Sequence, residues 1–282
     1  MMIHAGSRGD LPSFAQPPVT EVVLSIQCAS IPGFRAIHAG LLWQHFRATH
    51  PRVSEQPPIA QAFETFGSGM PTAVPFRIEA FMTPPMPRFW FESEDATHLL
   101  QVQQDRFAHN WRKQDDETVY PRYEPIRKRF ADEINTISAF LAGEGLGPIQ
   151  PNQCEVVDTN VIALPDGADP HVNLERVTPL WGGWQHDAAL EPLENASITL
   201  RYLIRSDDIP IGRVYVDFQP VRRTIDASPA IKLEITVRGK PKENNLDSAF
   251  RMLDTAREAV VRTFDRVTTK ELHSAWGKIN VS

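Results

Sequence analysis

The densest group of chemically capable side chains in this sequence lies between positions 105 and 123. Guanidinium, imidazole, amide, indole, phenol and carboxylate groups occur there at Asp105, Arg106, His109, Asn110, Trp111, Arg112, Arg122 and Tyr123. A guanidinium presents a planar fork to a carboxylate or phosphate, and an indole presents a stacking face. We expect a loop here, after a strand from Leu99, that binds an anionic or aromatic ligand, a single-stranded nucleotide or a partner peptide. The structural alternative is an Asp105–Arg106 pair within a sheet and a Trp111 side chain that fills the core.

Two further stretches could contribute to a binding site. Trp181-Gly182-Gly183-Trp184 places two indoles on a glycine hinge, which could act as a mobile lid or form a buried corner. His273 would line a deep cleft together with Arg106 and Tyr123 if the protein carries a small ligand between a long helix and a sheet.

Recognised catalytic motifs are missing from the sequence. It contains no HExxH zinc motif, no GxxxxGK[ST] phosphate loop and no GxSxG nucleophile elbow. The two cysteines, Cys28 and Cys154, lie in apolar runs, where a reactive thiolate is disfavoured. We therefore predict no catalytic residue, no metal site and no cofactor. We interpret the cysteines as buried free thiols, with a disulfide between them as the open alternative.

Composition restricts the class of protein. The 282 residues carry a formal net charge of −6 and a sequence pI of about 5.9, which argues against a surface built to coat nucleic acid. The first residues lack the basic and apolar regions of a signal peptide, and no apolar run approaches the ~18 residues needed to span a membrane. We expect a cytoplasmic protein.

The residues just described must be positioned by regular elements, and hydrophobic periodicity predicts these along the chain. Residues 1–17 are expected to form a flexible arm. In a first half, 18–150, we predict strands at 19–30, 76–82, 88–92 and from 98, a helix at 37–46, a loop at 54–75 and an amphipathic helix at 123–140. In a second half, 151–282, we predict strands at 153–157, 198–204, 214–218 and 231–237, an irregular stretch at 165–197 and a long helix at 246–267.

The order of elements in the two halves is similar, which suggests an internal duplication. Glu21-Val22-Val23 also corresponds to Glu155-Val156-Val157. We predict an α+β fold in which two βαβββα-like halves form one curved antiparallel sheet, covered on one face by long helices. This arrangement resembles the TATA-binding-protein-like and helix-grip folds. The alternative is two independent modules. In this alignment the strand from Leu99 matches the strand from Ile231, and 106–113 is an extension specific to the first half.

Several motifs resemble those of a sporadically distributed bacterial protein family of about this length. They are Pro17-Pro18-Val19-Thr20-Glu21-Val22-Val23-Leu24-Ser25-Ile26-Gln27, Gln101-Val102-Gln103-Gln104-Asp105-Arg106-Phe107, Asn110-Trp111-Arg112, Tyr120-Pro121-Arg122-Tyr123, Phe264-Asp265-Arg266-Val267-Thr268 and His273-Ser274-Ala275-Trp276-Gly277. The resemblance spans nearly the whole chain. It implies one integrated protein and association with mobile, defence or toxin–antitoxin loci, but no particular reaction.

These observations together predict a non-catalytic binding or interaction protein. Its expected partner is another protein or a second copy of the chain. Two alternatives stay open at the level of sequence. One is an enzyme or small-ligand carrier with a helix-grip cleft, and the other is a single-stranded nucleic-acid binder that uses the polar face of the sheet.

Overall fold

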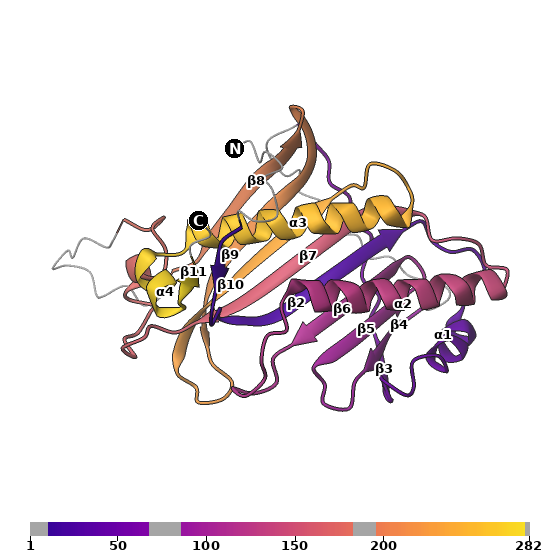
Figure 1. Ribbon diagram of the computed structural model, residues 1–282, viewed down its shortest axis with the longest axis horizontal. Helices are drawn as coiled ribbons and strands as arrows, with labels where there is room; N and C mark the ends of the chain where they lie inside the picture. Colours follow the sequence, from indigo (N-terminus) through magenta and orange to yellow (C-terminus); the bar gives the residue numbers. More distant parts are fainter. Residues whose placement is uncertain (1–10, 68–85, 183–195, 280–282) are drawn as a thin grey trace, which may run out of the picture.

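One nine-stranded antiparallel sheet dominates the computed structural model, which describes residues 11–67, 86–182 and 196–279 (Figure 1). The strand order is β3-β4-β5-β6-β2-β7-β10-β9-β8. The strands are β2 (Val19–Cys28), β3 (Arg52–Gln56), β4 (Arg88–Glu92), β5 (His98–Gln103), β6 (Arg106–Arg112), β7 (Pro151–Ile162), β8 (Ile198–Ser206), β9 (Ile209–Arg222) and β10 (Pro229–Gly239). The predicted α+β class with a large antiparallel sheet is confirmed. The strand predicted at 76–82 lies outside the described residues.

Strands from both predicted halves share this sheet. The first strand of each half, β2 and β7, pair with each other at its centre. Outward from this pair, β6, β5 and β4 follow on one side and β10, β9 and β8 on the other, with β3 as an extra edge strand. Because the central pair joins residues far apart in the sequence, neither half is an independent sheet.

Side chains alternate between two faces of the sheet, as the period of a strand requires. One row of register partners runs Leu100, His109, Leu24, Val156, Val237 and Val214 across six strands, and all of these residues are buried. The neighbouring row on the opposite face is polar and includes Gln101, Ser25, Glu155, Arg238 and Arg213. We call the first of these the helix face and the second the opposite face.

Helices α2 (Tyr123–Gly143) and α3 (Leu246–Val267) lie over the helix face (Figure 1). The buried stripe of α2 includes Ile126, Phe130, Ile134 and Ile137, and the stripe of α3 has the same three- and four-residue spacing. The Asn245 side chain caps α3 by accepting a hydrogen bond from the Ser248 N–H. The two helices touch, since the Phe130 and Phe250 rings lie 5.9 Å apart.

Shorter elements complete the described chain. They are α1 (Ala36–Trp43), the single turn Leu174–Arg176, α4 (Lys270–Ala275) and a two-stranded sheet of β1 (Ser13–Phe14) with β11 (Lys278–Ile279). The inner end of the predicted flexible arm is therefore paired with the far end of the chain. Phe14 packs there against Phe264 and Trp276. No helix among the described residues is long and apolar enough to cross a membrane.

The structure corrects the prediction for the stretch from Leu99. This stretch is a hairpin, because Gln104 and Asp105 form the turn between β5 and β6. Residues 106–112 are therefore a strand and not a loop. The last strand before α2 is β6, so β6 occupies the place that β10 holds in the second half. Part of the predicted 54–75 loop is also regular, because Arg52–Gln56 pairs with β4.

Candidate ligand-binding groove

A groove with a volume of about 730 Å³ runs between the start of α2 and the middle of α3. It adjoins a smaller space of about 50 Å³, called the inner cavity here, that is lined by α3, β7 and the segment around β1. Arg122, Arg257, Ser13 and Val261 line both spaces. The groove therefore leads from the surface to the centre of the sheet.

Two polar residues of β7 form the floor of the inner cavity. The helix face of this strand carries Cys154, Val156 and Ile162, but at the intervening positions it carries Asp158 and Asn160. Asp158 is 5% exposed and Asn160 is fully buried. The Asn160 amide donates a hydrogen bond of 2.7 Å to Asp158 Oδ1, whereas Asn160 Oδ1 has no partner among the described residues. A buried acceptor without a donor is unfavourable, and it marks this cavity as a place for a hydrogen-bonding group.

A second unsatisfied group faces the same cavity. The Tyr120 hydroxyl is buried and has no hydrogen-bond partner within the described chain. Burial raises the pKa of this phenol to about 12, so it stays protonated and can donate or accept a hydrogen bond. Burial also raises the pKa of the Asp158 carboxyl, and the nearby Arg257 charge opposes this shift. The inner cavity thus combines two acceptor sites and one hydroxyl.

Two arginines stand at the junction of cavity and groove. The Arg257 guanidinium lies 5.6 Å from the Tyr123 ring centre and forms no hydrogen bond or ion pair with any residue that the structure describes. Arg122 lies 5.7 Å from the Tyr120 ring and donates a hydrogen bond of 3.2 Å to the Ala15 carbonyl. Arg122 also begins α2 with φ of 75°, a left-handed conformation that non-glycine residues rarely adopt.

Two of the three carboxylates on the groove wall are already committed to other cations, whereas the third, Glu124, is exposed at the start of α2. Asp254 accepts hydrogen bonds from the Tyr123 hydroxyl at 2.9 Å and from Arg127 at 3.0 Å. Glu258 pairs with Arg262 at 2.9 Å, one turn further along α3. The charge of Arg257 is therefore not neutralised by these two neighbours. The arrangement can hold an anion at the rim and a hydrogen-bond donor at Asn160 and Asp158.

The structure does not bring the predicted 105–112 cluster together at one site. Strand alternation sends Arg106, Asn110 and Arg112 to the opposite face, where each has a partner. Arg106 donates to Gln27 at 2.7 Å, Asn110 donates to Glu21 at 2.6 Å and Arg112 pairs with Glu92. Asp105 accepts from Gln103 at 2.7 Å within the turn. Trp111 is 2% exposed and belongs to the core, so the structural alternative holds for this residue.

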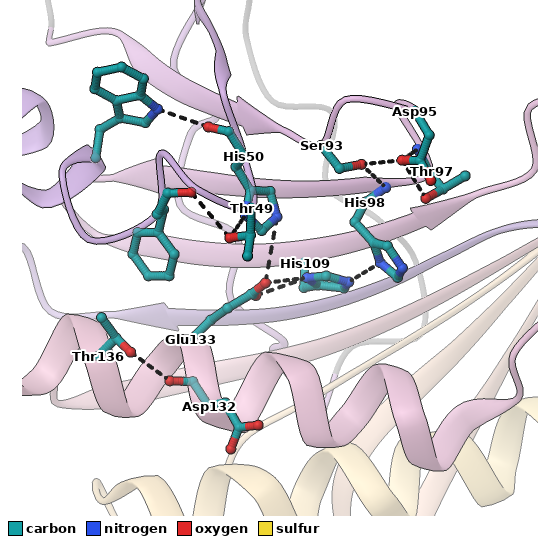
Figure 2. Close-up of polar contacts among 12 residues, drawn as sticks. Thr49, His50, Ser93, Asp95, Thr97, His98, His109, Asp132, Glu133 and Thr136 are labelled. Carbon is teal, nitrogen blue, oxygen red and sulfur yellow. Dashed lines mark hydrogen bonds and ion pairs between the residues drawn. The ribbon is translucent and has the colours of Figure 1, made fainter.

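His109 points the other way, into a buried polar chain beneath α2. Figure 2 shows it between Glu133 and His98. Its Nδ1 lies 2.8 Å from Glu133 Oε2 and its Nε2 lies 3.1 Å from His98 Nδ1. His50 Nε2 lies 3.8 Å from Glu133 Oε1 and has no hydrogen bond within the described residues. Sequence reasoning missed this chain, although Glu133 stands between Phe130 and Ile134 on the apolar stripe of α2.

The other predicted residues have separate locations. Arg122 and Tyr123 line the groove, as a binding role requires, but His273 lies on α4, where it contacts Thr268 Oγ1 at 2.8 Å. The predicted cleft of His273, Arg106 and Tyr123 is wrong, because Arg106 lies on the opposite face of the sheet. Trp181 packs partly buried against the core, and Trp184 lies outside the described residues.

Four groove residues were not predicted from the sequence: Tyr120, Asp158, Asn160 and Arg257. The available signal was the interruption of the alternating apolar positions of β7 by Asp158 and Asn160. Both cysteines are free and buried in the structure. Within the described part of the chain, no group of three potential metal ligands is arranged to hold an ion. Comparison of the chain with protein-family models, curated proteins and solved structures finds no match.

Proposed function

We propose that this protein is a non-catalytic binding protein that holds a small anionic molecule in the groove between α2 and α3. The observation that carries the proposal is that three groups without a hydrogen-bond partner among the described residues belong to the lining of one space: a cation and two buried polar atoms. Arg257 supplies the cation, and Asn160 Oδ1 and the Tyr120 hydroxyl supply the unsatisfied groups. A ligand that supplies the missing hydrogen bonds and the opposite charge lowers the free energy of these side chains.

The dimensions of the site restrict the ligand. An inner cavity of about 50 Å³ accommodates a hydroxyl, an amine or a few water molecules, but no ring. Asn160 Oδ1 is an acceptor, so it favours a donor such as an ammonium or hydroxyl group. A carboxylate or phosphate would lie against Arg257 and Arg122. The proposed ligand class is therefore a small carboxylate or phosphate that bears an amine or hydroxyl group.

The fold offers further support for this location. We propose that the two halves are copies of one βαβββα-like unit and that the whole resembles a helix-grip fold, in which a long helix closes over an antiparallel sheet. The matching strand orders on the two sides of the β2–β7 pair support this view. Membership of the bacterial family that the motifs resemble is part of the same proposal, and its Tyr120–Tyr123 motif lies at the groove.

A nucleic-acid function for the sheet is less well supported. On the opposite face, Arg238 pairs with Glu155, Lys232 pairs with Glu234 and Arg112 pairs with Glu92. These carboxylates neutralise the cations that would otherwise attract phosphates. The net charge of −6 also disfavours binding to nucleic acid.

Thermal-shift screening with a panel of amino acids, hydroxy acids and phosphorylated metabolites tests the proposal. A ligand present at 100 times its dissociation constant stabilises the folded state by about 2.7 kcal/mol, which is readily detected. Arg257→Ala should abolish the shift. Arg251→Ala is the matched control, because Arg251 is an exposed arginine on the same helix. A panel without any hit, or a hit that Arg257→Ala leaves unchanged, would reject this function.

A further inference from the structure

Residues 57–67, here called the strap, leave β3 and cross the opposite face of the sheet. Their contacts lie on β5, β6, β2, β10 and β9 in turn. The side chains that hold the strap are Gln103, Arg106, Gln27, Arg238, Arg213 and Tyr215. This surface lies on the other side of the sheet from the groove, so the inference below is independent of the proposed function.

The first part of the strap is held through its main chain. The Gln103 side chain donates to the Ile59 carbonyl at 2.8 Å and accepts from the Ile59 N–H at 2.8 Å. Gln27 Oε1 accepts from the Ala62 N–H at 2.8 Å, and Arg106 donates to the Ala60 carbonyl at 3.4 Å. The three side chains that make these contacts are all at least nine-tenths buried. These contacts recognise an extended peptide backbone, and one strap side chain adds to them, because the Gln61 amide donates to the Cys28 carbonyl at 3.1 Å.

The second part of the strap is held through a single carboxylate. The Glu64 side chain is 1% exposed, although it belongs to a segment without regular structure. Its Oε2 lies 2.5 Å from Arg213 Nη1, and its Oε1 accepts from the Tyr215 hydroxyl at 2.7 Å and lies 3.6 Å from Arg238. Two cations and a phenol on adjacent strands thus form a pocket that selects an acidic side chain, with Arg238 shared between Glu64 and its partner Glu155.

The apolar side chains of the strap bury little surface, although the Phe66 ring lies 5.6 Å from the Arg213 guanidinium. Ile59, Phe63 and Phe66 are 40%, 54% and 36% exposed, whereas a segment that served to cover the core would bury them. The strap is therefore held by main-chain hydrogen bonds, the Gln61 amide and one carboxylate, without the large apolar burial that fixes a core element. These are the contacts by which proteins bind extended peptides.

We propose that this surface is a binding site for an extended acidic peptide of a partner protein, and that the strap occupies it within the chain until the partner displaces it. The peptide would place one residue against Gln103 and a glutamate five residues later in the pocket of Arg213, Tyr215 and Arg238. Because the strap is tethered, its high effective concentration sets the affinity that a partner must exceed.

A labelled peptide with the sequence of residues 57–67 provides the probe, and fluorescence anisotropy measures its binding. Two variants weaken the internal competitor: Glu64→Gln, and replacement of residues 57–66 by a glycine–serine linker of equal length. We expect the peptide to bind both variants at least tenfold more tightly than the wild type. A peptide with glutamine in place of its glutamate should bind at least tenfold more weakly.

The pocket itself is tested by a second substitution in the linker variant. Arg213→Ala should abolish peptide binding, whereas Arg222→Ala, at the far end of the same strand β9, should not change it. Circular dichroism melting checks that each variant is folded. The proposal is overturned if the peptide binds neither weakened variant while both are folded. It is also overturned if the glutamine peptide binds equally well, or if Arg213→Ala has no effect on binding.

Discussion

Replacing His98 by glutamine should make the stability of this protein less sensitive to acid. In the folded chain, burial lowers the pKa of His98 to about 3 from an ordinary value of 6.5, and Arg129 and His109 add to the effect. The unfolded chain therefore takes up a proton below pH 6.5 that the folded chain does not, and stability falls with pH from there down to about 3. Above pH 6.5 His98 is neutral in both the folded and the unfolded chain, so its contribution to the free energy of unfolding does not change with pH.

The size of this effect follows from the linkage between protonation and folding. Each pH unit below the unfolded pKa costs at most about 1.4 kcal/mol, and solvent screening of the partly exposed His98 reduces its cost at pH 5 to about 1–2 kcal/mol. The pKa of His50 is also lowered by burial, which acts in the same direction. Hydrogen bonds from Ser93 and Thr97 hold the pKa of Asp95 at about 2. The contribution of Asp95 to stability therefore changes only below its ordinary pKa of 3.8, well below pH 5.

Urea unfolding at pH 7.5 and pH 5 measures the difference directly. Wild type should lose about 1–2 kcal/mol more than His98→Gln between the two conditions. Contributions of groups remote from His98 cancel in this comparison, because both proteins contain them in the same surroundings. His45→Gln is the control, since His45 is exposed and should leave the pH dependence of wild type unchanged. Equal losses in wild type and His98→Gln would refute the assignment of His98 as a neutral buried member of the Glu133–His109–His98 chain.

Two further substitutions probe the core and the groove floor. Trp111→Ala should lower the free energy of unfolding by about 3–5 kcal/mol in urea titrations, because Trp111 is among the largest fully buried side chains; a loss below 1 kcal/mol would contradict its core role. Burial raises the pKa of Asp158 in the folded state, so its ionisation opposes folding as the pH rises above 3.8. Asp158→Asn removes this cost, so the variant should melt higher relative to wild type at pH 7.5 than it does at pH 4. A melting temperature that is lower at both pH values would show that the carboxylate is needed for packing.

Much of the architecture is encoded in local patterns that can be recognised without a structure. Strands β8, β9 and β10 alternate between apolar and polar residues over most of their length, because only one of their faces meets the core. Helices α2 and α3 show three- and four-residue spacing for the same reason. The hairpin of β5 and β6 was misjudged because its turn residues, Gln104 and Asp105, include no glycine or proline. Its second strand, β6, is also rich in polar residues, which form hydrogen bonds with the strap and with other side chains on the opposite face.

The candidate site was harder to predict because it depends on contacts between distant segments. Tyr120, Asp158 and Arg257 come together only when β7 lies beneath α3 and the chain before α2 passes over both. Glu64 gave no signal in the sequence, since its partners are more than 140 residues away. Arg122 and Tyr123 were identified by residue type alone. They line the groove because the fold places the start of α2 beside α3, and not because they belong to the loop that the sequence predicted.

The pairing of β2 with β7 also has a consequence for folding. Strand β2 joins β6 on one side, about 90 residues later in the chain, and β7 on the other, about 140 residues later. During synthesis, the first half can close its own strands and α2 while the inner edge of β2 still waits for β7 to emerge from the ribosome. That bare, apolar edge at the middle of the future sheet is the point at which a nascent or truncated chain is most exposed to mispairing and aggregation.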